Sequence, residues 1–509
     1  MSKFYLTTPI YYVNDKPHIG HAYTTLASDA MILWHRMCGD ETFLLTGTDE
    51  NSQKNSEAAA RKLGIAHGVI TREQVQGYVD EMSALWQRTW DSIGVACSRF
   101  IRTTERDHIV AVNKFINTVR DNDDIYLGTY AGWYCVDCEA FLPEKELKGG
   151  MCPMHTRAVE RIEEKNYFFR LSKYRDRLIK HFEQHPNFVQ PVSRRNEILA
   201  YIQDHLEDMS ISRPIRHWGI PFPGDETQAV YVWFDALTNY LSGVGYGSDD
   251  ELFAKWWPAN VQIIGKDILK FHAALWPAML MSAGLPLPER VFAHGFFTID
   301  GRKMSKSLHN AVDPILISEK YSTDVLRYFL FREIPFGGDG DFSEQRLRER
   351  YASDLQHGIG NLAARTIAMT HKYAGGKAPR ARDESMVEME WEKYDVAMEG
   401  IEPHTALDVI ESLLRRADRY IDAQKPWVLA KDETKRDQLL RVLGDLLELL
   451  RVCAVMYYPI MPNISEQILT ALGQAQWKSE PYEELKKWGR IEEGTAIAKL
   501  EHLFPPLSS

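Results

Sequence analysis

The first fifty residues alternate between two hydrophobic periodicities. Residues 3–13, "KFYLTTPIYYV", are rich in aromatic and β-branched side chains and predict a strand. From Pro17 the apolar positions follow a helical period through "AYTTLASDAMILWHRM", and Gly39 is placed to end that helix. "ETFLLTGTDE" predicts a second strand that runs into a polar turn. Strand, helix and strand in this order predict the start of a parallel α/β sheet.

The α/β pattern is interrupted over residues 117–227. This stretch is turn-rich and charged and contains a cluster of cysteines. The pattern then resumes in "AVYVWFDALTNY" and "VQIIGKDILKFH", each of which has the form of a strand followed by a helix. An insertion within a nucleotide-binding sheet explains this order most simply.

Beyond about residue 355 the apolar positions recur at helical spacing, and Pro426 and Pro462 punctuate the series. We predict an all-helical bundle with a leucine-rich core. The residues that carry this pattern are Leu407, Ile410, Leu414, Leu439, Leu443, Leu446 and Leu450.

The composition is that of an ordinary globular protein, with 44% hydrophobic and 26% charged residues in 509. A net charge of -11 argues weakly against indiscriminate nucleic-acid binding, although local basic patches can still meet such a partner. The N-terminus has no charged-then-apolar signal, and the most apolar stretch, "AALWPAMLMSAGLPLP", is too short and proline-broken to span a bilayer. We therefore expect a cytoplasmic protein.

Three of the six cysteines cluster in a pattern typical of a metal site. "CVDCEAFLPEKELKGGMCPMH" has the form C-x2-C, a 13-residue loop and C-x2-H. Four soft ligands suit tetrahedral Zn²⁺, and a filled ligand set makes the metal structural, not catalytic. The alternative is a set of reduced, unliganded thiols. The predicted ligands are Cys135, Cys138, Cys152 and His155, and the isolated Cys38, Cys97 and Cys453 are interpreted as buried small hydrophobic residues.

Two histidines flank Ile19-Gly20 at the start of the first predicted helix. His18 and His21 could bind a metal, bind an anion, cap the helix or fill a core. Their position favours phosphate, because free N–H groups and the helix dipole attract anions there. Gly20 lets a ligand approach the backbone closely.

A second basic segment, "DGRKMSKSLHN", lies far along the chain. Lys303 and Lys306 flank Met304-Ser305 in a glycine-led loop, where two lysines and two hydroxyls can bind a polyphosphate. A solvated basic loop is the competing interpretation.

"HIGH" followed at long range by "KMSKS" is the signature pair of class I aminoacyl-tRNA synthetases, and this chain resembles that class. Further segments are similar to the methionyl-tRNA synthetase family over nearly the whole chain: "TGTDE", "ISRPIRHWGIPFP", "YVWFDALTNY", "IIGKDILKFHAALWPAML", "GNLAARTI" and "KPWVLAK". The isoleucyl, valyl and leucyl families carry a large editing insertion, for which the roughly 110 residues between the sheet halves leave no room. The cysteinyl family uses zinc for its substrate thiol, whereas the ligand set here looks saturated.

The resemblance implies a Rossmann-like parallel-sheet catalytic domain with a zinc-binding insertion, followed by an all-α anticodon-binding bundle. The expected segments are the first catalytic half over 1–116, a connective insertion with the zinc knuckle over 117–227, the second catalytic half over 228–296, a KMSKS-loop and stem-contact region over 297–354, and the helical anticodon-binding domain over 355–509.

The family pattern also implies a methionine pocket, an aromatic and aliphatic box suited to a polarizable thioether. Asp49 would hold the amino group. The other residues implied are Ile10, Tyr12, Trp233, Ala236, Leu237, Tyr240, Ile268 and His272, each of which taken singly is as well explained by a place in the core.

For ATP, the resemblance implies that Gly265 and Asp267 contact the ribose and adenine. The triphosphate would be bound by the catalytic residues His18, His21, Lys303 and Lys306, with Lys306 stabilising transition-state charge. Methionine's own carboxylate attacks the α-phosphate, so the protein needs no nucleophile. Mg²⁺ is expected with ATP, and one structural Zn²⁺ per chain.

Asn361, Arg365 and Trp427 match family positions that contact the anticodon, where bases stack on an indole and bond to polar side chains. For Trp427 the alternative is a wedge after Pro426 packed inside the bundle.

The function implied is ATP-dependent activation of L-methionine and its transfer to initiator and elongator tRNA(Met), by a cytoplasmic monomer without membrane partners. The monomer is expected because the chain ends shortly after "LFPP". Two alternatives stay open: a zinc-stapled RNA-binding paralogue without catalysis, and a different "HIGH"-type synthetase or nucleotidylyltransferase.

Overall fold

The computed structural model describes residues 2–136, 140–142, 144–154, 157–215, 218–299, 301–303, 311–387 and 389–507. The chain folds into two compact units, and neither is continuous in sequence. Lys3–Pro17 and Phe43–His294 form one unit, called here the sheet unit. His18–Thr42 and Gly295–Ser509, with the first two residues, form the other, called the helical unit.

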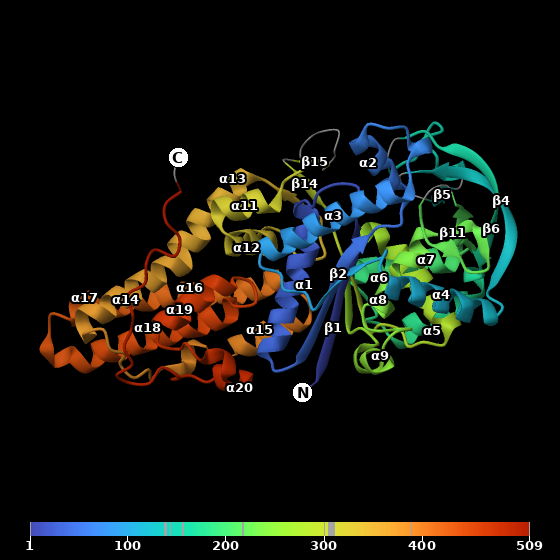
Figure 1. The fold of residues 1–509 in the computed structure, drawn as a ribbon. Helices are drawn as coiled ribbons and strands as arrows, with labels where there is room; N and C mark the ends of the chain where they lie inside the picture. Colours follow the sequence, from blue (N-terminus) through green and yellow to red (C-terminus); the bar gives the residue numbers. More distant parts are fainter. Residues whose placement is uncertain are drawn as a thin grey trace. The chain divides into compact units, whose positions relative to one another are not determined.

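A six-stranded sheet is the centre of the sheet unit, with the strand order β3-β2-β1-β12-β13-β7 (Figure 1). β1 pairs in parallel with β12, β12 with β13, β13 with β7, and β2 with β3. The predicted parallel α/β sheet is therefore confirmed. The strands are β1 (Lys3–Tyr12), β2 (Glu41–Asp49), β3 (Arg99–Arg102), β7 (Val189–Gln190), β12 (Val261–Gly265) and β13 (Val291–His294).

Central strands of a parallel sheet are covered on both faces, and β1 shows this directly. Every residue from Phe4 to Pro9 is buried, as expected for a strand between two layers of helices. Gly47 on β2 lies opposite Ile101 on β3. A Cβ at Gly47 would lie 2.0 Å from the Ile101 carbonyl oxygen, so only glycine fits there.

Two strands differ from the sequence prediction. The strand expected before the "WFDALTNY" helix is β11 (Asp225–Val230), which pairs with β9 (Ser212–Pro214) and β10 (Pro221–Phe222) in a separate three-stranded sheet. The short β7, which lies within the predicted insertion, pairs with β13 at the edge of the main sheet. Periodicity identifies a strand but not its neighbour, because strand pairing depends on contacts far apart in sequence.

A second sheet is formed by strands that lie, along the sequence, between β3 and β12 of the first sheet. Its order is β5-β4-β6-β8, and β4 and β6 form a long antiparallel pair from Ile125↔Phe169 to Tyr134↔Glu160. Figure 1 shows this pair as a long curved ribbon within the sheet unit. The strands are β4 (Ile125–Cys135), β5 (Ala140–Leu142), β6 (Glu160–Phe169) and β8 (Met209–Ser210).

One apolar core holds the helices of the sheet unit against its strands. Phe115 of α4 packs near Phe234 of α7 and Trp276 of α10, with ring centroids 6.0 and 6.1 Å away. The helices are α2 (Gln53–Leu63), α3 (Arg72–Ser92), α4 (Arg106–Asp121), α5 (Arg175–Gln184), α6 (Val192–His205), α7 (Val232–Ala236), α8 (Asn239–Ser242), α9 (Asp250–Trp256) and α10 (Trp276–Ala283).

The helical unit contains a small sheet of order β15-β14-β16 and a series of helices. The strands are β14 (Phe297–Ile299), β15 (Arg302–Lys303) and β16 (Gly340–Phe342). The helices are α1 (Ile19–Met37), α11 (Pro314–Tyr321), α12 (Thr323–Glu333), α13 (Glu344–Arg350), α14 (Asn361–Ala374), α15 (Glu390–Glu399), α16 (Pro403–Gln424), α17 (Pro426–Leu429), α18 (Arg436–Tyr457), α19 (Pro462–Ala471) and α20 (Tyr482–Leu485).

α18 is the central helix of the predicted bundle, and α14, α16 and α19 pack against it (Figure 1). All seven apolar positions of the predicted pattern are buried on α16 and α18. The helical prediction for this part of the chain is therefore confirmed.

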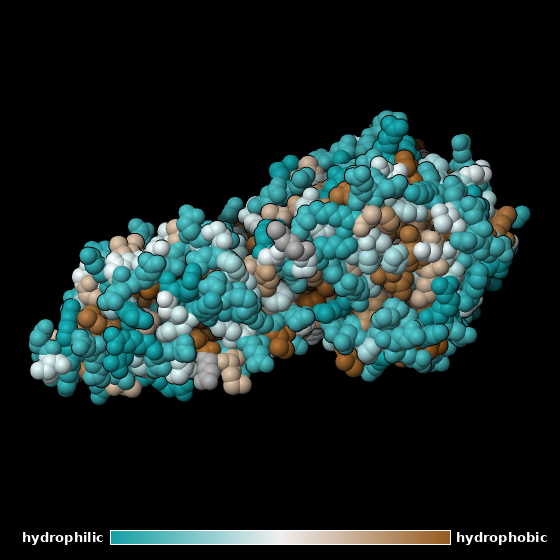
Figure 2. Space-filling model, turned by 90° about the horizontal axis from the view of Figure 1, so that it is seen from below, coloured by the Kyte–Doolittle hydropathy of each residue, from teal (hydrophilic) through white to brown (hydrophobic). Residues whose placement is uncertain are grey.

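The face shown in Figure 2 is mostly hydrophilic, with apolar residues scattered singly or in small groups. Within the described residues, every helix is too short or too polar to cross a bilayer.

Candidate active site

Most residues predicted to bind the amino acid lie at or after the carboxyl ends of parallel strands. Ile10 and Tyr12 lie at the end of β1, Asp49 is the last residue of β2, and Ile268 and His272 follow β12. The carboxyl edge of a parallel sheet is where open α/β folds bind ligands. The nine predicted pocket residues are called here the strand-end cluster: Ile10, Tyr12, Asp49, Trp233, Ala236, Leu237, Tyr240, Ile268 and His272.

Several members of the strand-end cluster are in contact. Leu237 and Tyr240 belong to the buried core, and Ile10, Trp233 and Ile268 pack against that core. Ala236, buried on α7, lies between Trp233 and Leu237 in sequence. The sheet unit therefore places the predicted box beside its own core.

His272 has both ring nitrogens fixed by neighbours. Its Nδ1 lies 3.0 Å from the Ile268 carbonyl oxygen, and its Nε2 lies 2.7 Å from the Tyr240 hydroxyl. A carbonyl oxygen only accepts, so Nδ1 carries the proton, and Nε2 accepts from the tyrosine. Burial lowers the pKa of His272 to about 4, against the smaller opposing effect of the Ile268 hydrogen bond. The ring is therefore neutral, and burial also raises the pKa of Tyr240 above its ordinary value.

Trp233 forms the aromatic side of the cluster. Its ring stacks on Phe271, with centroids 3.9 Å apart and planes 9° apart, and it lies edge-on to His272 at 6.3 Å. The indole Nε1–H is buried and has no hydrogen-bond partner among the described residues. Buried indole N–H groups usually find an acceptor, and that of Trp233 is one of several in the described residues that have none.

Asp49 is the charged member of the cluster and is buried, with 4% of its surface exposed. Its carbonyl oxygen accepts a hydrogen bond from Asn55 Nδ2 at 2.8 Å, which ties the strand end to α2. Next to it, the buried Glu50 carboxylate accepts two hydrogen bonds from Arg102, at 2.8 and 3.0 Å. A buried carboxylate at the end of a parallel strand suits an ammonium group.

Gly265 and Asp267 lie where β12 turns into the following helix. A Cβ on Gly265 would lie 2.6 Å from Oδ1 of Asp267, so a larger residue there would displace that carboxylate. The chain continues through the short turn η4 (Lys266–Ile268) and the π-helical turn η5 (Phe271–Leu275) into α10. Single π-helical turns are often found at functional sites.

In the helical unit, His18 and His21 cap α1. The Gly20 N–H donates to His18 Nδ1 at 3.1 Å, and the His18 N–H donates to His21 Nδ1 at 3.2 Å. Their rings stack with centroids 3.6 Å apart. This is a capping box made by two histidines. One of the competing interpretations, the capping role, is therefore realised.

The capping corrects the expected mode of phosphate binding. The first N–H groups of α1 are already used, because Ile19 donates to the Val312 carbonyl at 2.9 Å and His21 and Ala22 donate to the His18 carbonyl. Free backbone N–H groups, as expected from sequence, are therefore not offered by this helix start. Since both Nδ1 atoms accept, each neutral ring carries its proton on Nε2, which remains a donor.

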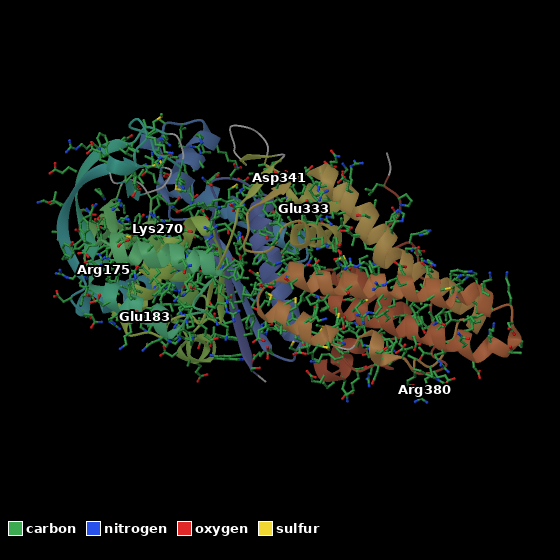
Figure 3. All side chains as sticks on the ribbon, turned by 180° about the vertical axis from the view of Figure 1, so that it is seen from behind. Arg175, Glu183, Lys270, Glu333, Asp341 and Arg380 are labelled. Atoms are coloured by element: carbon green, nitrogen blue, oxygen red, sulfur yellow. The ribbon has the colours of Figure 1, made fainter. Side chains whose placement is uncertain are left out.

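Lys303 is the last residue of β15, and its backbone pairs with Thr298 on β14. The Asp341 carboxylate accepts from Thr298 Oγ1 at 2.5 Å and from the Gly301 N–H at 2.8 Å, which holds the turn before Lys303. Figure 3 labels Asp341 on the small sheet of the helical unit. Lys306 lies outside the described residues.

Two of the four predicted metal ligands are described. Cys135 ends β4, Cys152 lies in the segment between β5 and β6, and both are fully buried in one small cluster with Val159. The Cys152 N–H donates to the Arg157 carbonyl at 2.8 Å, so the loop folds back on itself. Two buried thiols in one cluster fit a shared metal. Cys138 and His155 lie outside the described residues.

The three predicted anticodon residues lie on helices of the helical unit. Asn361 is the first residue of α14, and Arg365 on the same helix lies 3.7 Å from the Asp418 carboxylate. Trp427 is 41% exposed, whereas Pro426 before it is buried. Its exposure excludes the alternative of a wedge buried inside the bundle.

Two residues of this region were missed by sequence reasoning. Lys54 on α2 places its Nζ 4.5 Å from the centroid of the Tyr12 ring. Phe271, which precedes His272, stacks on Trp233. The aromatic pair "FH" after "GKDILK" could have been noticed, but nothing in the sequence indicates that Lys54 meets Tyr12.

Two family models match the chain. The family described as "tRNA synthetases class I (M)" matches residues 4–162 and 156–367. The family described as "Anticodon binding domain of methionyl tRNA ligase" matches residues 374–508.

Curated proteins and solved structures give the same family as the two family models. The chain is 44% identical to the methionine–tRNA ligase of Caldanaerobacter subterraneus subsp. tengcongensis, over 99% of this chain and 78% of that protein. It is 43% identical to that of Thermotoga maritima, over 100% of this chain and 81% of that protein. Mycobacterium tuberculosis methionyl-tRNA synthetase in complex with methionyl-adenylate matches with a TM-score of 0.94 and 37% identity, covering 99% of this chain and all of that one.

Proposed function

The chain belongs to the methionyl-tRNA synthetase family of class I, and we propose how its residues divide the work of methionine–tRNA ligation. The reaction has two steps. L-Methionine and ATP give methionyl-adenylate and pyrophosphate, and the methionyl group then passes to the 3′ end of tRNA. The proposal concerns which side chains bind each substrate and which stabilise the charge that develops.

The strand-end cluster would bind methionine. The Asp49 carboxylate would hold the ammonium group, and the apolar members would surround the thioether, which makes favourable contacts with aromatic rings. This assignment is supported by the neutral His272–Tyr240 pair, which presents no charge to the ligand. It is also supported by Trp233, whose ring lies edge-on to His272 and whose Nε1–H, a donor that a bound substrate can use, has no partner in the part of the chain that the structure describes.

Adenylation would depend on position and charge, not on a protein nucleophile. The methionine carboxylate attacks the α-phosphorus, the bond to the pyrophosphate oxygen breaks, and pyrophosphate carries away the charge. The Nε2–H groups of His18 and His21 would donate to phosphate oxygens, with Lys303 and Lys306 neutralising the leaving group. Gly265 and Asp267 would contact the ribose and adenine.

Two metals belong to the proposal. Mg²⁺ bound with ATP would neutralise part of the triphosphate charge. Cys135, Cys138, Cys152 and His155 would hold one structural Zn²⁺, whose role is to close the end of the β4–β6 insertion. The residues at this knuckle would thus act on stability and leave the adenylation chemistry to the strand ends.

The helical unit would recognise tRNA(Met), initiator and elongator alike. Asn361 and Arg365 would hydrogen-bond splayed anticodon bases, and the exposed Trp427 indole would stack on one of them. A cytoplasmic location and a monomeric state remain predictions of the resemblance.

The observation that carries the proposal is the strand-end cluster, because it combines a buried carboxylate with a neutral aromatic and aliphatic surround. ATP–pyrophosphate exchange measured with each of the twenty amino acids tests it. We expect exchange with methionine alone. Exchange with a different amino acid would contradict the pocket assignment, and tRNA binding without any exchange would support the RNA-binding paralogue.

The role of Lys306 is tested separately by Lys306→Ala. We expect methionine-dependent exchange to fall by about 10²-fold or more, the cost of removing one transition-state charge contact. Methionine binding without ATP should be unchanged. Wild-type exchange in this variant would remove Lys306 from the mechanism.

A further inference from the structure

A buried polar network connects elements that carry the strand-end cluster, and none of its members belongs to the cluster. Its centre is Asp235 on α7, whose side chain is fully buried. One carboxylate oxygen lies 2.6 Å from Nε2 of His108 on α4, also fully buried. The other accepts from Nδ2 of Asn51, in the loop after β2, at 2.9 Å.

Each partner of Asp235 is itself anchored. Nδ1 of His108 lies 2.8 Å from the Ser242 hydroxyl at the end of α8. The second hydrogen of the Asn51 amide goes to the Thr103 carbonyl, 3.0 Å away. The network therefore joins the loop after β2, the turn after β3, α4, α7 and α8, all within the sheet unit.

The joined elements are the ones that carry the proposed methionine contacts. Asn51 comes two residues after Asp49, and Asp235 lies between Trp233 and Ala236. Ser242 comes two residues after Tyr240. One carboxylate thus fixes the strand end that bears the charged contact relative to the helices that bear the aromatic contacts.

Glu50, which lies between Asp49 and Asn51 in sequence, supports the role of Asn51 as the link between this loop and α7. Its carboxylate is bound by Arg102, Thr104 and Thr48, so it cannot take part in the Asp235 network. The consecutive side chains of Glu50 and Asn51 therefore have different partners. Asn51 is the one that connects the loop to α7.

We propose that Asp235, held by His108 and Asn51, is a positioning residue for methionine, which sets the spacing between Asp49 and the Trp233 side of the pocket. The inference rests on the proposed methionine site. A carboxylate that only stabilised the fold would affect unfolding and not substrate affinity. A positioning carboxylate changes the KM for methionine when its partner is lost, because small displacements of binding groups are costly.

Asn51→Ala is the first test, since Asn51 is only half-buried and its truncation leaves the Asp235–His108 pair in place. We expect the KM for methionine in ATP–pyrophosphate exchange to rise about tenfold. The KM for ATP and kcat should stay within about threefold of wild type, because neither depends on this spacing.

An exchange of the two side chains gives a rescue test. Asn51→Asp places two carboxylates face to face and should raise the KM for methionine further than Asn51→Ala does. Adding Asp235→Asn restores a donor–acceptor pair, because the amide now at position 235 can donate to the carboxylate at position 51 and still accept from His108. We expect this double variant to recover part of the lost methionine affinity, because the carboxylate at position 51 cannot donate to the Thr103 carbonyl as Asn51 does.

Asp124→Asn is a matched control in the same unit. Asp124 is 1% exposed and accepts from Ser282 and Lys173 at 2.7 and 2.6 Å, far in sequence from every member of the strand-end cluster. It should lower the melting temperature and leave the KM for methionine unchanged. If Asn51→Ala and Asn51→Asp both leave that KM within twofold of wild type, or if the double variant is no better than Asn51→Asp, the positioning role is wrong. Absence of methionine-dependent exchange in the wild-type protein would instead overturn the proposed function and this inference with it.

Discussion

His272 shows how one residue's surroundings decide its chemical form. The Ile268 carbonyl fixes the proton on Nδ1, and the Tyr240 hydroxyl occupies Nε2. We predict that His272 titrates near pH 4, because burial lowers its pKa to about 4 from the ordinary 6.5. Hydrogen–deuterium exchange at the imidazole carbon, followed by mass spectrometry, measures this value. A pKa above 6 for His272 would contradict it.

The same shift makes stability pH-dependent. Between pH 6.5 and about 4, His272 is protonated in the unfolded chain but not in the folded one. Unfolding is therefore favoured as pH falls through this window. The full effect is about 3 kcal/mol, at about 1.36 kcal/mol per pH unit. His181 also has a pKa lowered by burial to about 4. The variant His272→Gln should lose the part of the acid-induced destabilisation that comes from His272 and keep the part that comes from His181. An unchanged dependence of the unfolding free energy on pH would contradict the lowered pKa of His272.

His21 caps α1, and we propose that it also donates a hydrogen bond to phosphate. A single substitution separates these two roles. His21→Glu keeps the capping box, because glutamate at the third helical position accepts the N-cap N–H through Oε1 and, unlike glutamine, has no N–H donor. α3 already has this arrangement, where Gln74 accepts from the Thr71 N–H at 3.0 Å. We predict a melting temperature close to wild type and exchange slowed by about 10²-fold, because the imidazole donor is lost.

The outcome of this comparison decides between the two interpretations of the histidine pair. Exchange at the wild-type rate in His21→Glu would leave capping as the role of His21. The sequence predicted a helix start at this pair and left the cap as one alternative, because Ser, Thr, Asp and Asn are the usual N-cap residues and histidine is not among them. The hydrogen bonds accepted by the two Nδ1 atoms show how two histidines replace them, with their rings stacked at 3.6 Å.

At the scale of elements, α1 is held in the helical unit by a buried ion pair. Arg327 on α12 donates to Asp29 on α1 at 2.7 Å and to the Ile460 and Pro459 carbonyls at 2.7 and 2.8 Å. Arg327→Met would leave the Asp29 carboxylate buried without its charge partner. We predict a destabilisation of about 3–5 kcal/mol, the usual cost of breaking such a pair from one side. Denaturant unfolding measures it.

A double variant separates the charge from the packing. Arg327→Met with Asp29→Leu removes both charges and should be more stable than Arg327→Met alone, because no unpaired charge stays buried. If the double variant is as unstable as the sum of the single variants, the carbonyl contacts dominate and the ion pair is incidental. The small acidic and basic pairs at the surface, such as Glu333 (labelled in Figure 3) with Arg346, contribute far less by comparison.

Elements differ in how far the sequence determines them. β1, α1 and β2 follow from periodicity and end signals alone, and so do the leucine positions of α16 and α18. β7 is only two residues long, and its place beside β13 depends on a partner about a hundred residues away. The same reason explains why β11 was assigned to the wrong sheet. Local pattern gives an element its type, and long-range pairing gives it a neighbour.

At the scale of the whole chain, the compact units do not follow sequence order. The strand and helix that open the chain belong to different units, and Arg327 meets Asp29 across 298 residues. Five consecutive segments were expected from the sequence, a division that linear patterns favour. The site residues were predicted as a family pattern, but their mutual contacts, including the Asp235 network, depend on packing that no single segment encodes.

The cysteine cluster makes a prediction for the whole protein, because closing an insertion affects its stability. We predict one Zn²⁺ per chain, bound with loss of protons from the ligating thiols. Removing it with a chelator should open the knuckle around Cys135 and Cys152 and lower the melting temperature of the sheet unit. Adenylation chemistry should persist at low temperature, because four protein ligands leave no coordination site for a substrate.

Metal analysis of two variants tests this directly. Cys152→Ser removes a buried thiol of the cluster and should abolish stoichiometric zinc. Cys453→Ser is the matched control, because Cys453 is equally buried on α18 and its burial raises the thiol pKa to about 12. A neutral thiol does not ligate zinc, so this variant should retain one equivalent. Zinc retained in Cys152→Ser, or lost in Cys453→Ser, would show that the metal is bound elsewhere.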